Sequence, residues 1–301
     1  MAKKIYEACR RLLTTCANCQ PDENILIVTD TDSLEIGMAL WDAAEEFPKK
    51  TMVMMEPRKM HGKEPTPLVA AAMLKADVIF RATKFSLSHS HARRDACAAG
   101  ARDLNCCDYS IEMLEKGDLY TDFEADRKYV DQLLKSMADG DQVHITSEAG
   151  TDYYASIKGH KLFPQYGMVR NPGETCSPPD IEMASGAMPG TAHGKIVVDG
   201  SITHPAMGVL KEPITIYVEN SFVTKIEGGE EAKRFAEELA KVGDPRMYRI
   251  GEIGIGLNPD ASLCGRTFYI AKTAAPLLPQ QAAAVFVFSR KKCMVHLPFG
   301  A

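Results

Sequence analysis

The first 140 residues alternate short apolar runs with segments of helical periodicity, and this alternation restricts the fold more than any other feature. The run Ile25-Leu26-Ile27-Val28 is followed by a polar stretch at 29–33, a helical pattern over 34–47 and a second apolar run at 51–55. Runs of this composition are typical of parallel strands buried on both faces, and together they form a β-α-β unit. The alternation continues with helices expected near 67–75, 89–99 and 120–138 and a strand at 77–80. We therefore predict an α/β N-terminal domain over 1–140, with an open, mostly parallel, doubly wound sheet.

The pattern changes after residue 140 to short strands and turns. Strands are expected at 142–146, 195–200 and 214–220, and an amphipathic helix at 230–242 is expected to pack over a sheet. We predict a β-rich α+β domain over 141–301. No G-x-G-x-x-G follows the first strand, so no dinucleotide site is predicted.

Composition excludes several classes of protein. The 40 acidic and 35 basic residues of the 301-residue chain are dispersed and give a net charge of −5, which offers no concentrated positive field for nucleic acid. No window reaches the roughly 18 consecutive apolar residues of a membrane span, and the N-terminus lacks the apolar region of a signal peptide. Nine cysteines at irregular spacings indicate reduced thiols. We expect a cytoplasmic protein without a nucleic-acid or membrane partner.

Two glutamates of the second domain have unusual surroundings. Glu182 follows the stiff Pro178-Pro179 and precedes small residues, and Glu252 lies in the glycine-spaced apolar run 250–256. A carboxylate buried in such a run needs a cation, a metal or several hydrogen-bond donors. For Glu252 a salt bridge to Arg246 or Arg249 is as good an explanation as a metal.

The histidines form no H-E-x-x-H or similar cluster, but one segment lies where α/β sheets bind ligands. The segment 86–94, with His89 and Arg93, falls between an expected strand and an expected helix, at the sheet edge where ligands are found. A polar cap on the helix explains its serines equally well. Thr151 and Asp152 follow Gly150 in a second segment, which is a functional turn or only a turn. These four side chains, of His89, Arg93, Thr151 and Asp152, are the candidate substrate-binding residues.

Six segments in order carry a resemblance to a known family. They are ILIVTDTDSLEIGMAL, MEPRKMHGKEPTP, AAAMLKADVIFRATKFSLSHSHARRDACAAGAR, ITSEAGTDYYASIKG, PPDIEMASGAMPGTAHGKIVVDGSI and IGEIGIGLNPDASLCG. The chain resembles the metallo-aminopeptidases that include aminopeptidase T and aminopeptidase S, a superfamily with a branch similar to 2,5-dihydroxypyridine dioxygenase.

The resemblance implies an N-terminal α/β domain, a C-terminal metal-binding domain and a homodimer. It places metal ligands at Glu182, where Asp180-Ile181 departs from the family pattern, and at Glu252, whose segment Gly251–Gly256 matches without a mismatch. The implied cofactor is a divalent metal, which is zinc, cobalt or manganese in the peptidase branch and iron(II) in the dioxygenase branch.

The resemblance stops near Gly265. The family's E-D-E, G-T-x-H and H-x-D motifs are absent from 266–301, and His296 alone remains as a candidate nitrogen ligand. A frameshifted or truncated C-terminus is one hypothesis for this atypical tail.

Three hypotheses of function follow from the resemblance. The main one is a metal-dependent aminopeptidase that removes N-terminal amino acids from peptides. The alternative is a mononuclear non-haem iron dioxygenase acting on a small dihydroxypyridine, in which open coordination positions take up dioxygen. The third is a degenerate, inactive member of the family.

Overall fold

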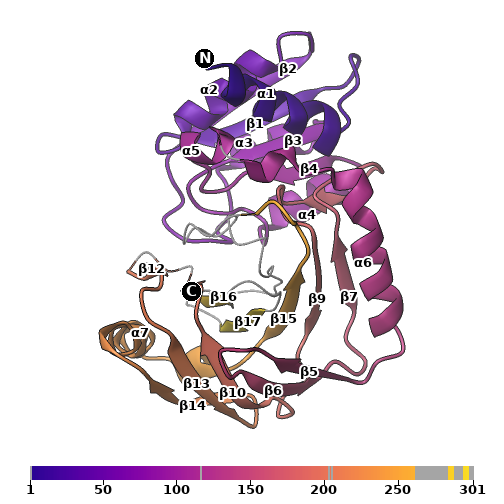
Figure 1. The fold of residues 1–301 in the computed structure, drawn as a ribbon. Coiled ribbons are helices and arrows are strands. Elements are labelled where there is room, and N and C mark those ends of the chain that lie inside the picture. Colours follow the sequence, from indigo (N-terminus) through magenta and orange to yellow (C-terminus); the bar gives the residue numbers. More distant parts are fainter. Residues whose placement is uncertain are drawn as a thin grey trace. The chain divides into compact units, whose positions relative to one another are not determined.

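The computed structural model describes residues 2–115, 117–202, 204, 206–261 and the backbone of 284–287 and 294–297 (Figure 1). The chain divides into two compact units. Unit 1 is Met1–Phe123 with Tyr166–Asp180, and unit 2 is Glu124–Gln165 with Ile181–Ala301. The expected boundary was at residue 140. In the structure residues 124–140 belong to unit 2, and one later segment, 166–180, returns to unit 1.

Unit 1 contains a five-stranded parallel sheet in the order β2-β1-β3-β4-β8. Its strands are β1 Ile25–Asp30, β2 Lys50–Met55, β3 Val78–Ala82, β4 Arg102–Asn105 and β8 Thr175–Cys176. The expected α/β class with a parallel sheet is confirmed. The strands β4 and β8 were not expected, because the first is short and rich in polar residues and the second comes from the later half of the chain.

Helices cover both faces of this sheet. They are α1 Lys3–Arg11, continued by a π-helical turn Leu12–Cys16, α2 Leu34–Ala43, α3 Pro67–Met73, α4 His91–Ala98, α5 Ile111–Glu115 and a 3₁₀ turn Gly117–Tyr120. On one face α3 and α4 bury Val69, Met73 and Ala96 against Leu26 and Val28 of β1.

The alternate side chains of β1, which point to the other face of the sheet, face α2. A Cβ atom at Gly37 would lie 2.9 Å from Thr29, so the missing side chain lets α2 approach the strand closely. The helices on the two faces make the sheet doubly wound, as predicted.

Unit 2 contains two antiparallel sheets. The first has the order β14-β13-β10-β6-β5. Its strands are β5 Gln142–Thr146, β6 Asp152–Ser156, β10 His193–Val198, β13 Ile214–Glu219 and β14 Phe222–Glu227. Helix α7, Glu230–Lys241, packs on β13 and β14 with Ala232, Phe235 and Leu239 buried, as its periodicity predicted.

The second sheet of unit 2 has the order β12-β11-β16-β17-β15-β9-β7. Its strands are β7 Leu162–Gln165, β9 Glu182–Gly186, β11 Ser201–Ile202, β12 Gly208–Val209, β15 Glu252–Gly256, β16 Ala284–Val287 and β17 Met294–Leu297. Helix α6, Phe123–Met137, and the 3₁₀ turn Pro245–Tyr248 complete the elements. Within the described ranges no helix is long and apolar enough to cross a membrane.

The thiols of Cys16 and Cys19 are free and buried. Burial raises the pKa of each to about 12. They are therefore protonated, weak nucleophiles at neutral pH.

Candidate functional site

The carboxyl edge of the unit 1 sheet is polar and lies at a topological switch point. From β1 the chain moves outward to β2, and it then returns across β1 to β3 on the other side. Ligands of open α/β sheets bind at such a reversal, beyond the carboxyl ends of the strands. At the end of β1 the carboxylate of Asp30, fully buried, accepts a 2.7 Å hydrogen bond from the backbone N–H of Lys84.

A cavity of about 540 Å³ opens at this edge. The chain segments that follow β1, β2 and β3 all line it. Its lining residues are Thr31, Asp32, Glu56, Pro57, Lys59 and Phe85.

His89 and Arg93, two of the predicted substrate-binding residues, lie together near the same edge. His89 is partly buried in the turn before α4, and Arg93 is in the first turn of that helix. Burial and the neighbouring guanidinium of Arg93 are the main causes that lower the pKa of His89 to about 4. The imidazole is therefore neutral at physiological pH, and its two ring nitrogens offer one donor and one acceptor.

The turn is organised by a buried ion pair that the sequence analysis missed. Arg81 of β3 and Asp103 of β4 both have fully buried side chains, and Arg81 donates to the two carboxylate oxygens at 2.6 and 2.8 Å. In the sequence, Arg81 is a charged residue next to the apolar run Val78-Ile79-Phe80, which indicates that its side chain is buried and needs a partner. That the partner is Asp103 could not be recognised before β3 and β4 were paired.

The predicted serine cap of α4 is confirmed. Ser90 is the N-cap residue, and its hydroxyl accepts from the backbone N–H of Arg93 at 3.2 Å. The carboxylate of Glu64 accepts from the backbone N–H groups of His91 and Ala92 at 2.6 and 3.1 Å. The capping explanation and the ligand-site explanation of this segment are thus compatible.

Glu182 and Glu252, the predicted metal ligands, lie on neighbouring antiparallel strands of unit 2. Glu182 of β9 is opposite Gly256, and Glu252 of β15 is opposite Gly186. Opposite residues share a face, so both glutamates lie on the same face, four positions apart, with α-carbons roughly 14 Å from each other. Their exposed fractions are 0% and 2%.

Burial raises the pKa of the Glu252 carboxyl well above its usual range. Arg246, one of the two arginines named as possible partners of Glu252, pairs with Asp244 at 2.5 Å. The alternative of a salt bridge from Glu252 to Arg249 stays a prediction. A cation near Glu252 would favour its charged form and offset the desolvation.

The register of β15 and β17 places the α-carbon of His296 opposite that of Glu252. The side chain of His296 lies outside the described residues. A carboxylate and an imidazole are the ligand types of non-haem iron sites. Within residues 2–261, as far as they are described, no group of three or more histidine, cysteine, aspartate or glutamate side chains is close enough to hold a metal.

Thr151 and Asp152 belong to the other sheet of unit 2, with Asp152 at the start of β6. Thr151 is buried, and its hydroxyl accepts from the N–H of Val197 at 2.9 Å and lies 3.3 Å from the carbonyl oxygen of Val197. Asp152 is exposed, and its carboxylate lies 2.8 Å from the ring of His144. Thr151 therefore links two chain segments.

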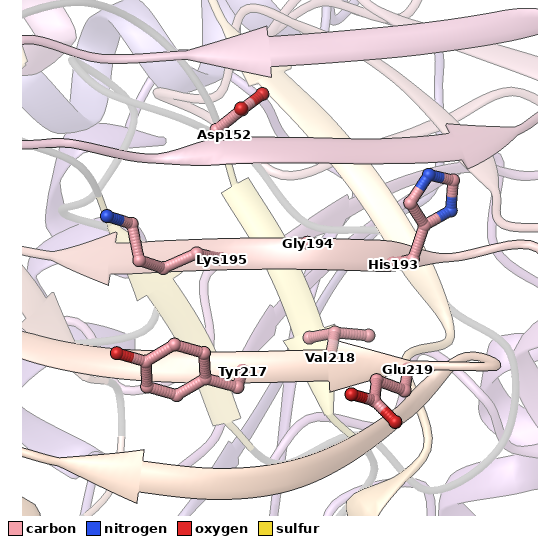
Figure 2. Close-up of a pocket in the computed structure, with 7 residues that line it drawn as sticks. All are labelled: Asp152, His193, Gly194, Lys195, Tyr217, Val218 and Glu219. Atoms are coloured by element: carbon pink, nitrogen blue, oxygen red, sulfur yellow. The ribbon is translucent and has the colours of Figure 1, made fainter.

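An open hollow of about 420 Å³ lies beside Asp152. Figure 2 shows the residues that line it. Side chains of β6, β10 and β13 line it, including those of His193, Lys195, Tyr217 and Glu219. The hollow lies over an exposed sheet face and holds no buried polar group among its lining side chains.

Comparisons with known proteins agree with the fold and identify a family. The family described as NicX: 2,5-dihydroxypyridine 5,6-dioxygenase matches residues 4–289. The 2,5-dihydroxypyridine 5,6-dioxygenase of Pseudomonas putida KT2440 is 32% identical over 120 residues, which are 40% of this chain and 34% of that protein. The aligned part thus spans about a third of the curated relative.

Two solved structures share the fold. The structure of 2,5-dihydroxypyridine dioxygenase from Pseudomonas putida KT2440 has a TM-score of 0.74 at 20% identity, covering 99% of this chain and 93% of that one. Wild-type AmpT from Thermus thermophilus has a TM-score of 0.62 at 12% identity, covering 90% of this chain and 80% of that one.

These findings correct the main hypothesis of function. The prediction of an aminopeptidase is wrong, because the family match names a dioxygenase, which was the alternative. The error arose because the shared fold was given the activity of its peptidase members. The family match also continues to residue 289, past Gly265 where the motif resemblance stops. Metal dependence, common to both expectations, is consistent with a dioxygenase.

Proposed function

Because the chain belongs to the 2,5-dihydroxypyridine 5,6-dioxygenase family, we propose that it opens the ring of a small dihydroxypyridine with dioxygen as the oxidant. The observation that carries this proposal is the family match over residues 4–289. In such a reaction the ring bond between carbons 5 and 6 breaks and both oxygen atoms remain in the product.

The proposed metal is iron(II), with Glu252 and His296 as candidate ligands of one ion. Glu182 stays a predicted metal ligand, but its α-carbon lies roughly 14 Å from that of Glu252, at or beyond the reach of two extended glutamate side chains around one ion. Bound iron(II) with open coordination positions supplies the one-electron chemistry by which dioxygen reacts with an organic ring. Support comes from the buried position and the raised pKa of Glu252. His296 is supported by the register opposite Glu252.

His89 and Arg93 are the proposed substrate-binding residues. A neutral imidazole can accept a hydrogen bond, or a proton, from a ring hydroxyl at its unprotonated nitrogen. Arg93, whose guanidinium lies beside the same turn, would orient an anionic oxygen of the substrate. Thr151 and Asp152 stay predictions, and the hydroxyl of Thr151 is already engaged with Val197.

The test is oxygen consumption by metal-depleted protein reconstituted with iron(II) and given 2,5-dihydroxypyridine. We expect uptake with iron(II) and little with zinc, and little with 2-hydroxypyridine, which lacks the second hydroxyl. E252Q should lose iron and activity, while E219Q, an exposed strand glutamate, should retain both. The absence of oxygen uptake by iron-loaded, folded protein would contradict the proposal and favour an inactive family member.

Two further measurements concern substrate binding and assembly. H89Q and R93K should raise KM or lower kcat, whereas R94K, a change in the adjacent arginine, should have a small effect. The homodimer that the resemblance implies is also a proposal, and sedimentation velocity at micromolar concentration tests it.

A further inference from the structure

Arg81 is a buried charge whose hydrogen bonds reach beyond its ion pair. Its exposed fraction is 0%. Besides Asp103, the guanidinium donates to the amide oxygen of Asn105 at 3.1 Å. The Asp103 carboxylate also accepts from the hydroxyl of Thr175 at 2.6 Å. The pair is therefore anchored to β3, β4 and β8 at once.

The remaining donors of Arg81 extend to the turn that precedes α4. Both terminal nitrogens of the guanidinium lie 3.1 Å from the hydroxyl oxygen of Ser88. The same oxygen accepts from the hydroxyl of Ser86 at 2.9 Å. The carbonyl oxygen of Ser88 accepts from Arg93 at 2.9 and 2.6 Å. Ser88 is thus fixed through both its side chain and its backbone.

His89 lies between two fixed residues. Ser88 is held from the sheet, and Ser90 caps α4 and donates to the carbonyl of Leu87 at 2.8 Å. The imidazole itself takes part in no hydrogen bond within the described part of the chain, so its position depends on its backbone and on packing. One packing contact is with Gly62, where an added Cβ would lie 3.2 Å from the Cβ of His89.

A buried ion pair contributes little net stability compared with an apolar pair of equal size, because desolvation offsets the attraction. Its main consequence is geometric, since the planar fork of arginine fixes the direction of each donor. We propose that Arg81 is a positioning residue: locked on Asp103, it holds Ser88 and thereby fixes where the imidazole of His89 stands. That this position matters for catalysis rests on the proposed function. That Arg81 fixes the position of the imidazole does not.

The basic groups that lower the pKa of His89 come from three elements. They are Arg81 of β3, Arg93 and Arg94 of α4, and His61 of the loop between β2 and α3. Because all are basic, loss of one charge would itself alter the titration of His89. The substitution that tests the proposal should therefore keep the positive charge at position 81 and remove only the planar arrangement of hydrogen-bond donors.

The experiment compares R81K with R102K by NMR, in protein whose histidines are isotopically labelled. The pH titration of the His89 ring is followed, and its signal is assigned as the one that is missing in H89Q. Lysine retains the charge but cannot reproduce the fork to Asp103 and Ser88. Arg102 is a matched control, because it makes a bidentate pair with Glu23 at 2.8 Å in the same unit, at the opposite end of β4. We expect R81K to raise the pKa of His89 by about one unit or more, toward its ordinary value, as the turn loosens and hydrates. R102K should leave it unchanged.

S88A provides a second variant in case R81K does not fold. It removes only the hydroxyl that Arg81 holds, and it should shift the titration of His89 in the same direction. In an active enzyme both variants should lower kcat/KM on the order of tenfold to a hundredfold. An unchanged His89 titration in folded R81K or in S88A would overturn the inference. A shifted titration in protein without oxygenase activity would refute the proposed function alone.

Discussion

Replacement of Glu252 by glutamine should alter the pH dependence of stability in the metal-free protein. Burial raises the pKa of this carboxyl well above its value of 4.5 in the unfolded chain. Between the two pKa values the folded state holds a proton that the unfolded state has lost. Stability therefore falls as pH rises, by about 1.4 kcal/mol for each pH unit.

Glutamine cannot titrate, so E252Q should lack this part of the slope. Over the pH range between the two pKa values, the wild type should lose about 1.4 kcal/mol more of its free energy of unfolding per pH unit than E252Q does. The assay is urea unfolding followed by far-ultraviolet circular dichroism, at several pH values and with a chelator present.

The control is E219Q, which changes an exposed glutamate on β13 and should keep the wild-type slope. Equal slopes for wild type and E252Q would show that the Glu252 carboxyl has no raised pKa. The argument that its burial calls for a cation would then fail as well.

Two other predictions concern the first sheet of unit 2. Gly194 has φ +116° and a Cβ there would overlap the carbonyl oxygen of Asp152, so G194A should lower the free energy of unfolding by more than about 2 kcal/mol. G190A, at φ +82° with open space around it, should cost only about 1 kcal/mol, and equal losses in urea titrations would contradict this. T151V removes the acceptor of the Val197 N–H and should cost about 1 to 3 kcal/mol in the same titrations. T151S keeps the hydroxyl and should retain most of the stability that T151V loses. A large rise in KM for T151V with unchanged stability would instead assign Thr151 to substrate binding.

The elements that the sequence determined are those set by local periodicity. The apolar run at Ile25–Val28 and the helical patterns near Leu34, Pro67 and Glu230 each match an element of the structure. Their side chains repeat with the period of a strand or a helix, so a window of a few turns identifies them.

The activity was predicted less well than the elements of secondary structure. The fold is shared by the solved structures of a 2,5-dihydroxypyridine dioxygenase and of AmpT, so the fold by itself does not decide the activity. The family match over the chain decided between them.

Only the tertiary structure decided which distant residues meet. Glu182 and Glu252 share one sheet face because β9 and β15 pair, and Arg81 meets Asp103 because β3 and β4 pair. Strand pairing depends on register and burial summed over whole sheets, which no local pattern encodes. The sequence alone thus determined the elements and the polar turn around His89, while the contacts that hold this turn required the assembled sheet.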